Sequence, residues 1–286
     1  MKRLIFGLIL TLFSSNLFAL PLPGAGKVEA LIARGLPPSL SSNYDFEGIV
    51  ALSNCSGSLV RFEDSRDTDL AMVLTNGHCF EGGLLQPGKV LVNTKSNRSF
   101  TLLSKTASPL GKVKAQKVLY ATMTKTDMAL YQLELNYAQI LTQFNIAPLT
   151  LASDYAEKAT DIEILSGYWK RGYSCRHDGL VFQMKEGDWL WEDSIRYSQP
   201  GCETIPGTSG SPIIAKGTKV VIGVNNTGNE NGEKCTQNNP CEIDQEGKIT
   251  YQKGLNYGQQ TSWIYGCMDA SHKIDLALPT CRLPRE

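Results

Sequence analysis

The sequence predicts an all-β protein made of two β-barrels, and three observations support this fold class. From Phe46 onward, short apolar or alternating segments recur at close spacing with turn residues between them, which is typical of barrels and sandwiches. The segments fall into two sets of similar size, separated by a mixed connector over residues 137–160. The 286 residues are 42% hydrophobic and 20% charged, which is enough chain and apolar surface for a large core.

The first set of expected strands covers residues 49–52, 58–62, 70–74, 90–92, 100–103, 118–122 and 128–133. The second set covers residues 162–166, 180–183, 194–197, 212–215 and 219–224. A polar stretch rich in Asn and Gly follows over residues 226–260, and TSWIYGCMDASH after it is expected to form a C-terminal helix. We place the first barrel at about residues 46–150 and the second at about 151–268, followed by a tail to residue 286.

The first 19 residues have the pattern of a secretory signal peptide. Lys2 and Arg3 precede the apolar run Leu4–Phe13, and small and polar residues follow it. This run is too short to span a bilayer; a lipid anchor or a buried helix is the alternative interpretation. Residues 20–45 are rich in Pro, Gly and Ser, so we expect a propeptide or an N-terminal arm. Residues 46–286 are expected to form the main domain, and the protein is expected to be secreted or periplasmic, with no membrane anchor after removal of the signal peptide.

Eight cysteines remain after the signal peptide, and an even number in an exported chain predicts disulfides. They are Cys55, Cys79, Cys175, Cys202, Cys235, Cys241, Cys267 and Cys281. No two of them have the CxxC spacing of a zinc site, and 105 pairings are open at this point. The formal net charge is zero, so no nucleic-acid partner is expected. We expect no cofactor and no metal.

The stretch GTSGSP (Gly207–Pro212) consists almost entirely of Gly, Ser and Thr. A serine in such a loop is either an ordinary turn residue or a catalytic nucleophile. A nucleophilic serine needs a base and a group that orients this base. His78 follows the apolar strand segment AMVLT, and Asp127 opens the segment DMALYQLEL. A surface histidine and a strand-capping aspartate are the ordinary alternatives for each of them alone. A carboxylate beside an apolar strand needs a partner, and a histidine N–H is one.

These three residues stand in the order His, Asp, Ser along the chain. The α/β-hydrolase fold needs G-x-S-x-G and the order Ser, Asp, His. Here Ser211 occupies the fifth position of the motif instead of glycine, so that fold is excluded.

With these motifs, the chain resembles a chymotrypsin-fold (trypsin-like) serine protease, and in particular the secreted bacterial members similar to glutamyl endopeptidases. The matching stretches are CSGSLV (Cys55–Val60), LTNGHC (Leu74–Cys79), TDMALYQL (Thr126–Leu133), GTSGSP and VIGVNNTG (Val221–Gly228), within roughly residues 46–268. The resemblance implies two six-stranded antiparallel barrels with a triad at their interface. It implies that Ser209 is the nucleophile, His78 the base, and Asp127 the group that orients the base. The N–H groups of Gly207 and Ser209 would form the oxyanion hole.

The resemblance also implies a Cys55–Cys79 disulfide around the histidine loop. Proximity in sequence then suggests Cys175–Cys202, Cys235–Cys241 and Cys267–Cys281 as the remaining pairs.

Some positions depart from the family pattern. Thr208 stands where trypsin-like members have the aspartate that pairs with a new N-terminus, so activation by that route is not expected. Glu203 lies six residues before Ser209, the place of the pocket-floor residue, which suggests Arg or Lys at P1 of the substrate. Asn225 stands where glutamate-specific relatives have a histidine, so glutamate specificity is not supported. Thr204 and Asn225 are further candidates for the pocket.

We therefore expect a monomeric serine endopeptidase that acts on proteins or peptides. A catalytically silent homologue that binds a partner is the first alternative, and a disulfide-rich structural protein is the second. The segment EIDQEGKITYQK (Glu242–Lys253) loosely resembles a calcium loop, but its last position is Lys253 instead of a glutamate, so a solvated hairpin turn is favoured.

Overall fold

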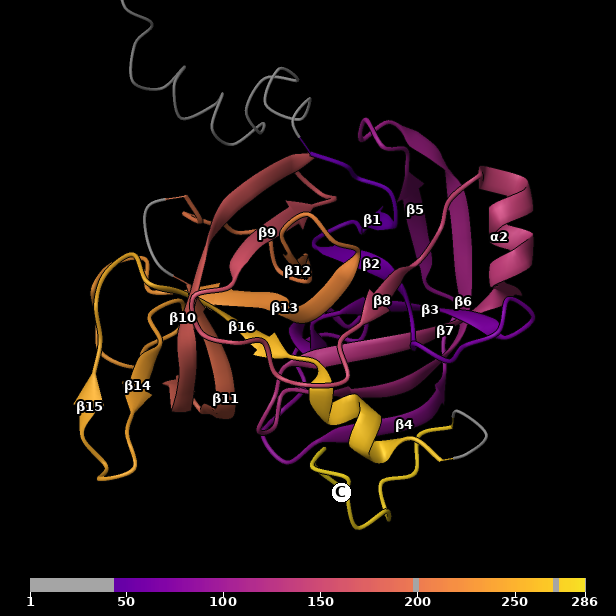
Figure 1. Ribbon diagram of the computed structural model, residues 1–286. Helices are drawn as coiled ribbons and strands as arrows, with labels where there is room; N and C mark the ends of the chain where they lie inside the picture. Colours follow the sequence, from indigo (N-terminus) through magenta and orange to yellow (C-terminus); the bar gives the residue numbers. More distant parts are fainter. Residues whose placement is uncertain (1–43, 198–200, 270–272, 286) are drawn as a thin grey trace, which may run out of the picture. The chain divides into compact units, whose positions relative to one another are not determined.

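The alternating segments pair into two closed six-stranded antiparallel barrels in the computed structural model, which confirms the predicted fold class (Figure 1). The structure describes residues 44–197, 201–269 and 273–285. The expected signal peptide, most of the expected N-terminal arm and His272 lie outside these residues.

The first barrel closes through pairings in the order β1-β5-β6-β7-β3-β2, with β2 pairing back to β1. Its strands are β1 (Ile49–Ala51), β2 (Ser56–Arg61), β3 (Leu70–Thr75), β5 (Ser99–Leu103), β6 (Pro109–Thr122) and β7 (Met128–Asn136). The strand β4 (Val90–Lys95) pairs with β6 outside this ring. Each expected strand of the first set is present.

The second barrel closes in the order β13-β12-β9-β10-β11-β16, with β16 pairing back to β13. Its strands are β9 (Asp161–Ser166), β10 (Arg171–Glu186), β11 (Trp189–Tyr197), β12 (Pro212–Ala215), β13 (Val220–Gly228) and β16 (Asn256–Gln260). The strands β14 (Cys241–Ile243) and β15 (Ile249–Thr250) form a hairpin, and β14 pairs with β10. The strand β16 lies within the stretch that was expected only to be polar.

The connector between the barrels contains α2 (Tyr137–Phe144) and β8 (Leu149–Leu151). The side chain of Asn136 accepts from the N–H of Gln139, and the Gln139 side chain accepts from the N–H of Asn136, which is a capping box. The strand β8 pairs in parallel with both β2 and β13. It therefore joins the two barrels and fixes their edges beside each other.

The expected C-terminal helix is a short 3-10 helix, η3 (Ser262–Cys267). At Gly266 a Cβ atom would lie only 2.4 Å from the carbonyl oxygen of Thr280, so the returning tail packs directly against this turn. The disulfide between Cys267 and Cys281 joins the same two segments. Among the described residues, no helix is long and apolar enough to cross a membrane.

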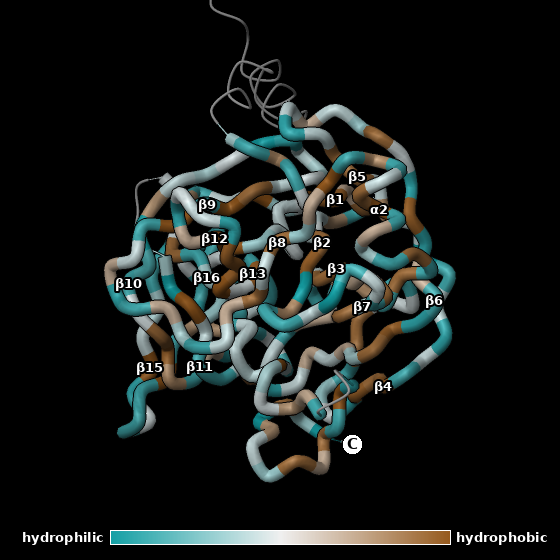
Figure 2. The backbone as a smooth tube through the Cα atoms, turned by 45° about the vertical axis from the view of Figure 1, so that its right-hand side comes forward, coloured by the Kyte–Doolittle hydropathy of each residue, from teal (hydrophilic) through white to brown (hydrophobic). Residues whose placement is uncertain are grey.

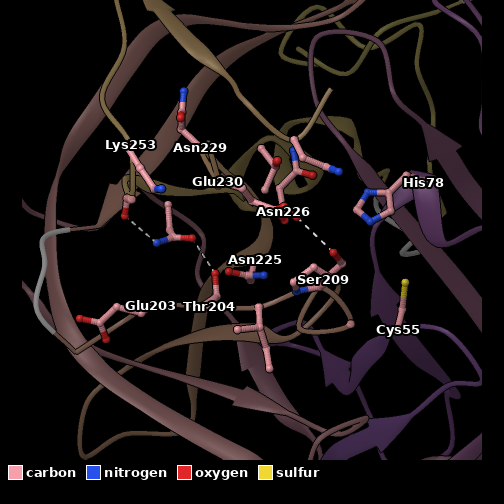
Figure 3. A pocket seen from close by; sticks show the side chains of 18 of the residues that line it. Cys55, His78, Glu203, Thr204, Ser209, Asn225, Asn226, Asn229, Glu230 and Lys253 are labelled. Atoms are coloured by element: carbon pink, nitrogen blue, oxygen red, sulfur yellow. Dashed lines mark hydrogen bonds between the residues drawn. The ribbon is translucent and has the colours of Figure 1, made fainter. Parts of the chain in front are cut away.

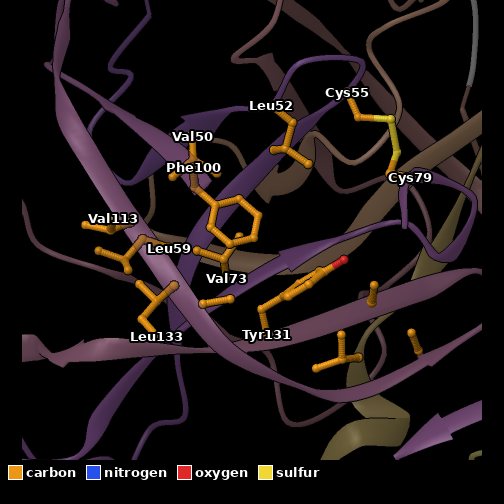
Figure 4. Close-up of a cluster of buried hydrophobic side chains, with 14 of the residues drawn as sticks. Val50, Leu52, Cys55, Leu59, Val73, Cys79, Phe100, Val113, Tyr131 and Leu133 are labelled. Carbon is orange, nitrogen blue, oxygen red and sulfur yellow. A yellow bond between two sulfur atoms is a disulfide. The ribbon is translucent and has the colours of Figure 1, made fainter. Parts of the chain in front are cut away.

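Hydrophobic segments follow the barrel strands, whereas the β14–β15 hairpin is largely hydrophilic (Figure 2). In the first barrel, Phe100 and Tyr131 pack edge to face with ring centroids 5.2 Å apart. Figure 4 shows this cluster with the Cys55–Cys79 disulfide beside it. The core thus reaches the segment that carries His78.

All four disulfide pairs agree with the sequence-based expectation. They are Cys55–Cys79, Cys175–Cys202, Cys235–Cys241 and Cys267–Cys281. No cysteine of the described residues is free.

Candidate active site

His78 and Asp127 form a hydrogen-bonded pair at the end of two neighbouring strands. His78 lies in the 3-10 turn η2 (Gly77–Cys79) after β3, and Asp127 directly precedes β7. These strands are antiparallel with Thr75 opposite Ala129, so the two side chains meet. The Nδ1 atom of His78 lies 2.7 Å from Oδ2 of Asp127, and the backbone N–H of His78 donates to Oδ1 at 3.0 Å. The fully buried carboxylate therefore has the partners that burial requires.

The turn that carries His78 is tightly packed against the neighbouring backbone. A Cβ atom on Gly77 would lie 2.0 Å from the carbonyl oxygen of Thr122, so only glycine fits this position. The side-chain amide of Asn76 donates to the carbonyl oxygen of Asp127 at 2.8 Å. The Asn76 side chain thus holds the backbone of Asp127, and the packed turn at Gly77 holds the backbone of His78, so both members of the pair are fixed in position.

Opposing effects act on the pKa of His78, and the net direction is upward from 6.5. Burial of the ring lowers the pKa, because it disfavours the charged form. The negative charge of Asp127 and its hydrogen bond raise the pKa, and Glu186 adds to this effect. An imidazolium at this position is therefore stabilised by nearby carboxylates, which suits a residue that takes up a proton.

Ser209 lies near His78 in a cleft of about 380 Å³, and Figure 3 shows both side chains at one end of it. The hydroxyl of Ser209 donates to the carbonyl oxygen of Asn226 at 3.2 Å. The next residue, Gly210, has φ of +82°, and a Cβ atom there would lie 2.1 Å from the carbonyl oxygen of Ser56. A glycine is required here, because a side chain would clash in this left-handed turn.

Ser56 anchors the loop that carries Ser209. Its N–H donates to the carbonyl oxygen of Ser209 at 2.8 Å, and its hydroxyl donates to that of Gly207 at 3.2 Å. Ser56 is itself fully buried, and its own carbonyl oxygen accepts from the hydroxyl of Thr75 at 2.7 Å. The carbonyl groups of Gly207 and Ser209 are therefore directed toward Ser56 in the first barrel.

Two backbone N–H groups of this loop remain free to bind a substrate. The amides of Thr208, Gly210 and Ser211 each donate to a backbone carbonyl group. Those of Gly207 and Ser209 donate to no described residue, and both residues line the cleft. Unpaired N–H groups are unfavourable unless water or a ligand occupies them, so this pair suits a developing negative charge on an oxygen.

The three residues expected in the specificity pocket all line the cleft, in different surroundings. Glu203 is exposed, its carboxylate accepts from the N–H of Gly201 at 3.1 Å, and it points away from Ser209 in Figure 3. Thr204 donates its hydroxyl to Oδ1 of Asn256 at 2.9 Å, and Asn225 is 2% exposed. The buried part of this wall is therefore polar and uncharged, and the carboxylate of Glu203 lies at the rim.

Glu186 is a site residue that sequence analysis missed. It is 7% exposed and shares a small cavity of about 110 Å³ with His78 and Asp127. One carboxylate oxygen accepts from the N–H of Asn238 at 2.8 Å, and the Thr227 side chain also bonds to the carboxylate. Burial raises the pKa of Glu186 above 4.5 against these hydrogen bonds. As the last residue of the long strand β10, it has no recognisable motif around it.

The other histidines do not join the site. His177 is buried in β10, with Nδ1 3.0 Å from the carbonyl oxygen of Glu157, and His272 lies outside the described residues. A grouping of Cys55, His78 and Cys79 has metal-like spacing. The two cysteines form a disulfide, so neither offers a thiolate to a metal ion.

The segment that resembles a calcium loop forms the hairpin turn that the sequence favoured. The side chain of Asp244 accepts from the N–H groups of Glu246 and Lys248. The carboxylate of Glu242 binds Arg196 at 2.9 Å and accepts from the hydroxyl of Tyr257 at 2.9 Å. Of the three acidic residues in this segment, Glu242, Asp244 and Glu246, the first two therefore accept hydrogen bonds from other groups of the protein.

Comparison with known protein families gives one match. A family model described as a trypsin-like peptidase domain matches residues 55–224, a span that contains His78, Asp127 and Ser209. No curated protein matches the chain.

Solved structures that are similar to this chain include one protease domain and two proteases, all with low sequence identity. The MamO protease domain from Magnetospirillum magneticum is 11% identical, with 76% of this chain and 93% of that chain covered, at a TM-score of 0.46. The protease Anisep from Arthrobacter nicotinovorans is 16% identical, with 76% and 91% covered, at 0.43. A glutamic acid-specific serine protease is 14% identical, with 74% and 91% covered, at 0.40.

Proposed function

Because the chain belongs to the trypsin-like peptidase family, we propose that it is an exported serine endopeptidase that acts through an acyl-enzyme on Ser209. Its substrates are proteins or peptides that bind in the cleft beside His78. The four disulfides support an oxidising compartment such as the periplasm or the medium. The signal peptide expected over residues 1–19 supports the same location.

The proposed reaction begins when the Ser209 hydroxyl turns from Asn226 toward Nε2 of His78. Oγ attacks the carbonyl carbon of the substrate, and Nε2 takes up the hydroxyl proton. The π electrons of the carbonyl group move to its oxygen, which accepts from the N–H groups of Gly207 and Ser209. Asp127 holds the ring through Nδ1 and stabilises the imidazolium that forms.

Collapse of the tetrahedral intermediate breaks the C–N bond and leaves an ester on Oγ of Ser209. The imidazolium of His78 gives its proton to the leaving amine. A water molecule then attacks the ester, His78 takes up a proton from it, and the acid product leaves as Oγ is protonated again.

One observation carries this proposal: the His78–Asp127 pair and two unpaired N–H groups face the same cleft as Ser209. A buried serine in a simple turn requires neither a buried carboxylate behind a histidine nor a free pair of N–H groups. This combination supports nucleophilic catalysis.

A catalytically silent homologue is the second candidate, and the Ser209–Asn226 hydrogen bond favours it. In a silent protein this hydroxyl would stay on the carbonyl oxygen of Asn226, and the cleft would only bind a partner.

Labelling of the mature protein with a fluorophosphonate probe tests the choice, with Ser209→Ala alongside. One adduct on Ser209, located by peptide mass spectrometry and lost in the variant, supports the endopeptidase. A folded protein with four disulfides that takes no label, before and after removal of residues 20–45, supports the silent homologue.

A further inference from the structure

We propose that Trp169 is a positioning residue for the oxyanion hole, an inference that rests on the proposed function. Its indole N–H holds the peptide group between Pro206 and Gly207 so that the Gly207 N–H faces the cleft. Trp169 lies in the turn between β9 and β10, 37 residues before Pro206 in the sequence. It does not contact the reacting atoms, and its effect passes through one peptide group.

The orientation follows from one hydrogen bond and the planarity of the peptide group. The Nε1 atom of Trp169 donates to the carbonyl oxygen of Pro206 at 2.8 Å. In a trans peptide the N–H of the following residue points opposite to this carbonyl group. The bond from Trp169 therefore directs the Gly207 N–H away from the indole, and Gly207 lines the cleft.

This peptide group needs an external anchor more than its neighbours do. Pro206 has no N–H, so it cannot fix the loop by donating a hydrogen bond. Gly207 has φ of +91°, and glycine accepts positive and negative φ about equally well. Rotation of the peptide group would place the Pro206 carbonyl oxygen in the cleft, where it repels the negative charge that the hole must stabilise. Among the described residues, Trp169 is the one donor to this carbonyl oxygen.

Trp169 is itself held in place by the same network that anchors the Ser209 loop. Its backbone N–H donates to the hydroxyl of Ser166 at 3.2 Å, and this hydroxyl lies 3.0 Å from that of Ser56. The Ser56 hydroxyl donates to the Gly207 carbonyl oxygen. Both sides of Gly207 thus connect to the β9–β10 turn, one through the indole and one through two serines.

The close approach of the indole also explains the glycine. A Cβ atom on Gly207 would lie 2.8 Å from Nε1 of Trp169 and 3.0 Å from the Tyr168 ring. The rings of Tyr168 and Trp169 pack edge to face with centroids 4.8 Å apart, so a displaced indole would also lose this contact. A residue with a side chain at position 207 would break the hydrogen bond that orients its own N–H.

The test compares Trp169→Phe, which keeps an aromatic ring and removes the N–H, with the matched control Trp263→Phe. Trp263 donates its indole N–H to the hydroxyl of Tyr155 at 2.7 Å, in the helix η3 outside the cleft. We expect kcat of Trp169→Phe to fall by about tenfold while KM changes less than about twofold. This loss lies between that of one neutral hydrogen bond and the roughly 10²–10³-fold loss of a whole oxyanion donor. The affinity for a peptide boronic acid, whose adduct places an oxygen in the hole, should fall in parallel.

The crystal structure of Trp169→Phe gives a second result that does not depend on turnover. We expect the Pro206–Gly207 peptide group to be rotated, or to occupy two orientations, with φ of Gly207 leaving the positive region. An unchanged peptide group, or kcat equal to that of the wild type in a variant with normal thermal stability, would overturn the proposal. If the wild type takes no fluorophosphonate label, the proposed function fails on that result, and the crystal structure still decides the role of Trp169.

Discussion

The hydroxyl of Ser209 donates to the carbonyl oxygen of Asn226 across 3.2 Å, while His78 is already bonded to Asp127. The base and the group that orients it are therefore assembled before a substrate binds. The nucleophile reaches the base by rotation about its own Cα–Cβ bond, which is a small and rapid motion. The proposed catalysis therefore depends on a side-chain rotation and not on formation of the His78–Asp127 pair.

The first prediction concerns Asp127, because the paired and buried carboxylate fixes which ring nitrogen of His78 carries the proton. We expect Asp127→Asn to lower kcat by on the order of 10⁴-fold, since the amide can bond to the ring in the wrong tautomer. Hydrolysis of a fluorogenic peptide measures the change. The control is Asp67→Asn, at an exposed aspartate paired with Arg61 at the surface, which should keep wild-type activity. Equal activity in both variants would contradict a triad.

The second prediction concerns the pH dependence of the reaction. The base must be neutral to accept the serine proton, and the pKa of His78 is raised above 6.5 by Asp127 and Glu186. We therefore expect kcat/KM to increase with pH, with a midpoint above 6.5. The imidazole resonances of His78, followed by NMR in the free enzyme, should give the same midpoint. A midpoint below 6.5 would mean that burial lowers the pKa of His78 by more than the two carboxylates raise it.

Glu186 provides a third, separate prediction, because its charge contributes to the raised pKa of His78. Glu186→Gln removes this charge, so the midpoint of kcat/KM should move to lower pH. Burial raises the pKa of Glu186 above 4.5, so the ionised carboxylate lowers the free energy of unfolding. This loss of stability is absent below pH 4.5, because the carboxyl group is then mostly protonated in both the folded and the unfolded state. The variant should therefore unfold at an equal or higher temperature than the wild type at pH 8. A lower unfolding temperature at pH 8 would contradict this account.

Much of the fold was predictable because apolar alternation marks the strands that form the two barrels. The strand β16, NYGQQ, was not, because its five buried residues are mostly polar. Gln259 there donates to the hydroxyl of Ser194, its partner on the neighbouring strand β11, at 3.2 Å, so buried polar contacts replace the apolar pattern. Glycine and asparagine are also depleted from strands in general, so local composition opposed this assignment.

The residues of the proposed triad could be singled out for a different reason: each stands beside a strand edge in a short motif. Glu186 and Trp169 were not, because they reach the site only through tertiary contacts. Glu186 lies at the end of β10 and lines the cavity beside His78. Trp169 lies in the turn between β9 and β10 and donates to the carbonyl oxygen of Pro206. No spacing along the chain marks either contact.

The fourth prediction compares two disulfides that close loops of different length. Cys55–Cys79 spans 24 residues and Cys235–Cys241 spans 6. In the chain-entropy account, loss of the first costs about 3.4 kcal/mol and loss of the second about 2.2 kcal/mol. Paired Cys→Ala variants, unfolded in urea, should follow this order. The first variant should also lose activity, because Cys79 adjoins His78, whereas the second should remain active. A larger stability loss in the second variant would contradict the entropy argument.

The final prediction concerns the residue of the substrate at P1. Glu203 was expected to select Arg or Lys, but its carboxylate lies at the rim and accepts from the N–H of Gly201. Asn225 and Asn256 are buried in the wall of the cleft and Thr204 is half-buried there, and all three are polar and uncharged. The other charged residues of the lining, Glu230 and Lys253, are exposed. Desolvating a basic side chain against the three polar residues is unfavourable without a buried acid, so we expect a preference for uncharged P1 residues. Glu203→Gln should leave the preference in a P1 peptide library unchanged. If the wild type cleaves after Arg or Lys and Glu203→Gln does not, Glu203 forms the floor of the pocket.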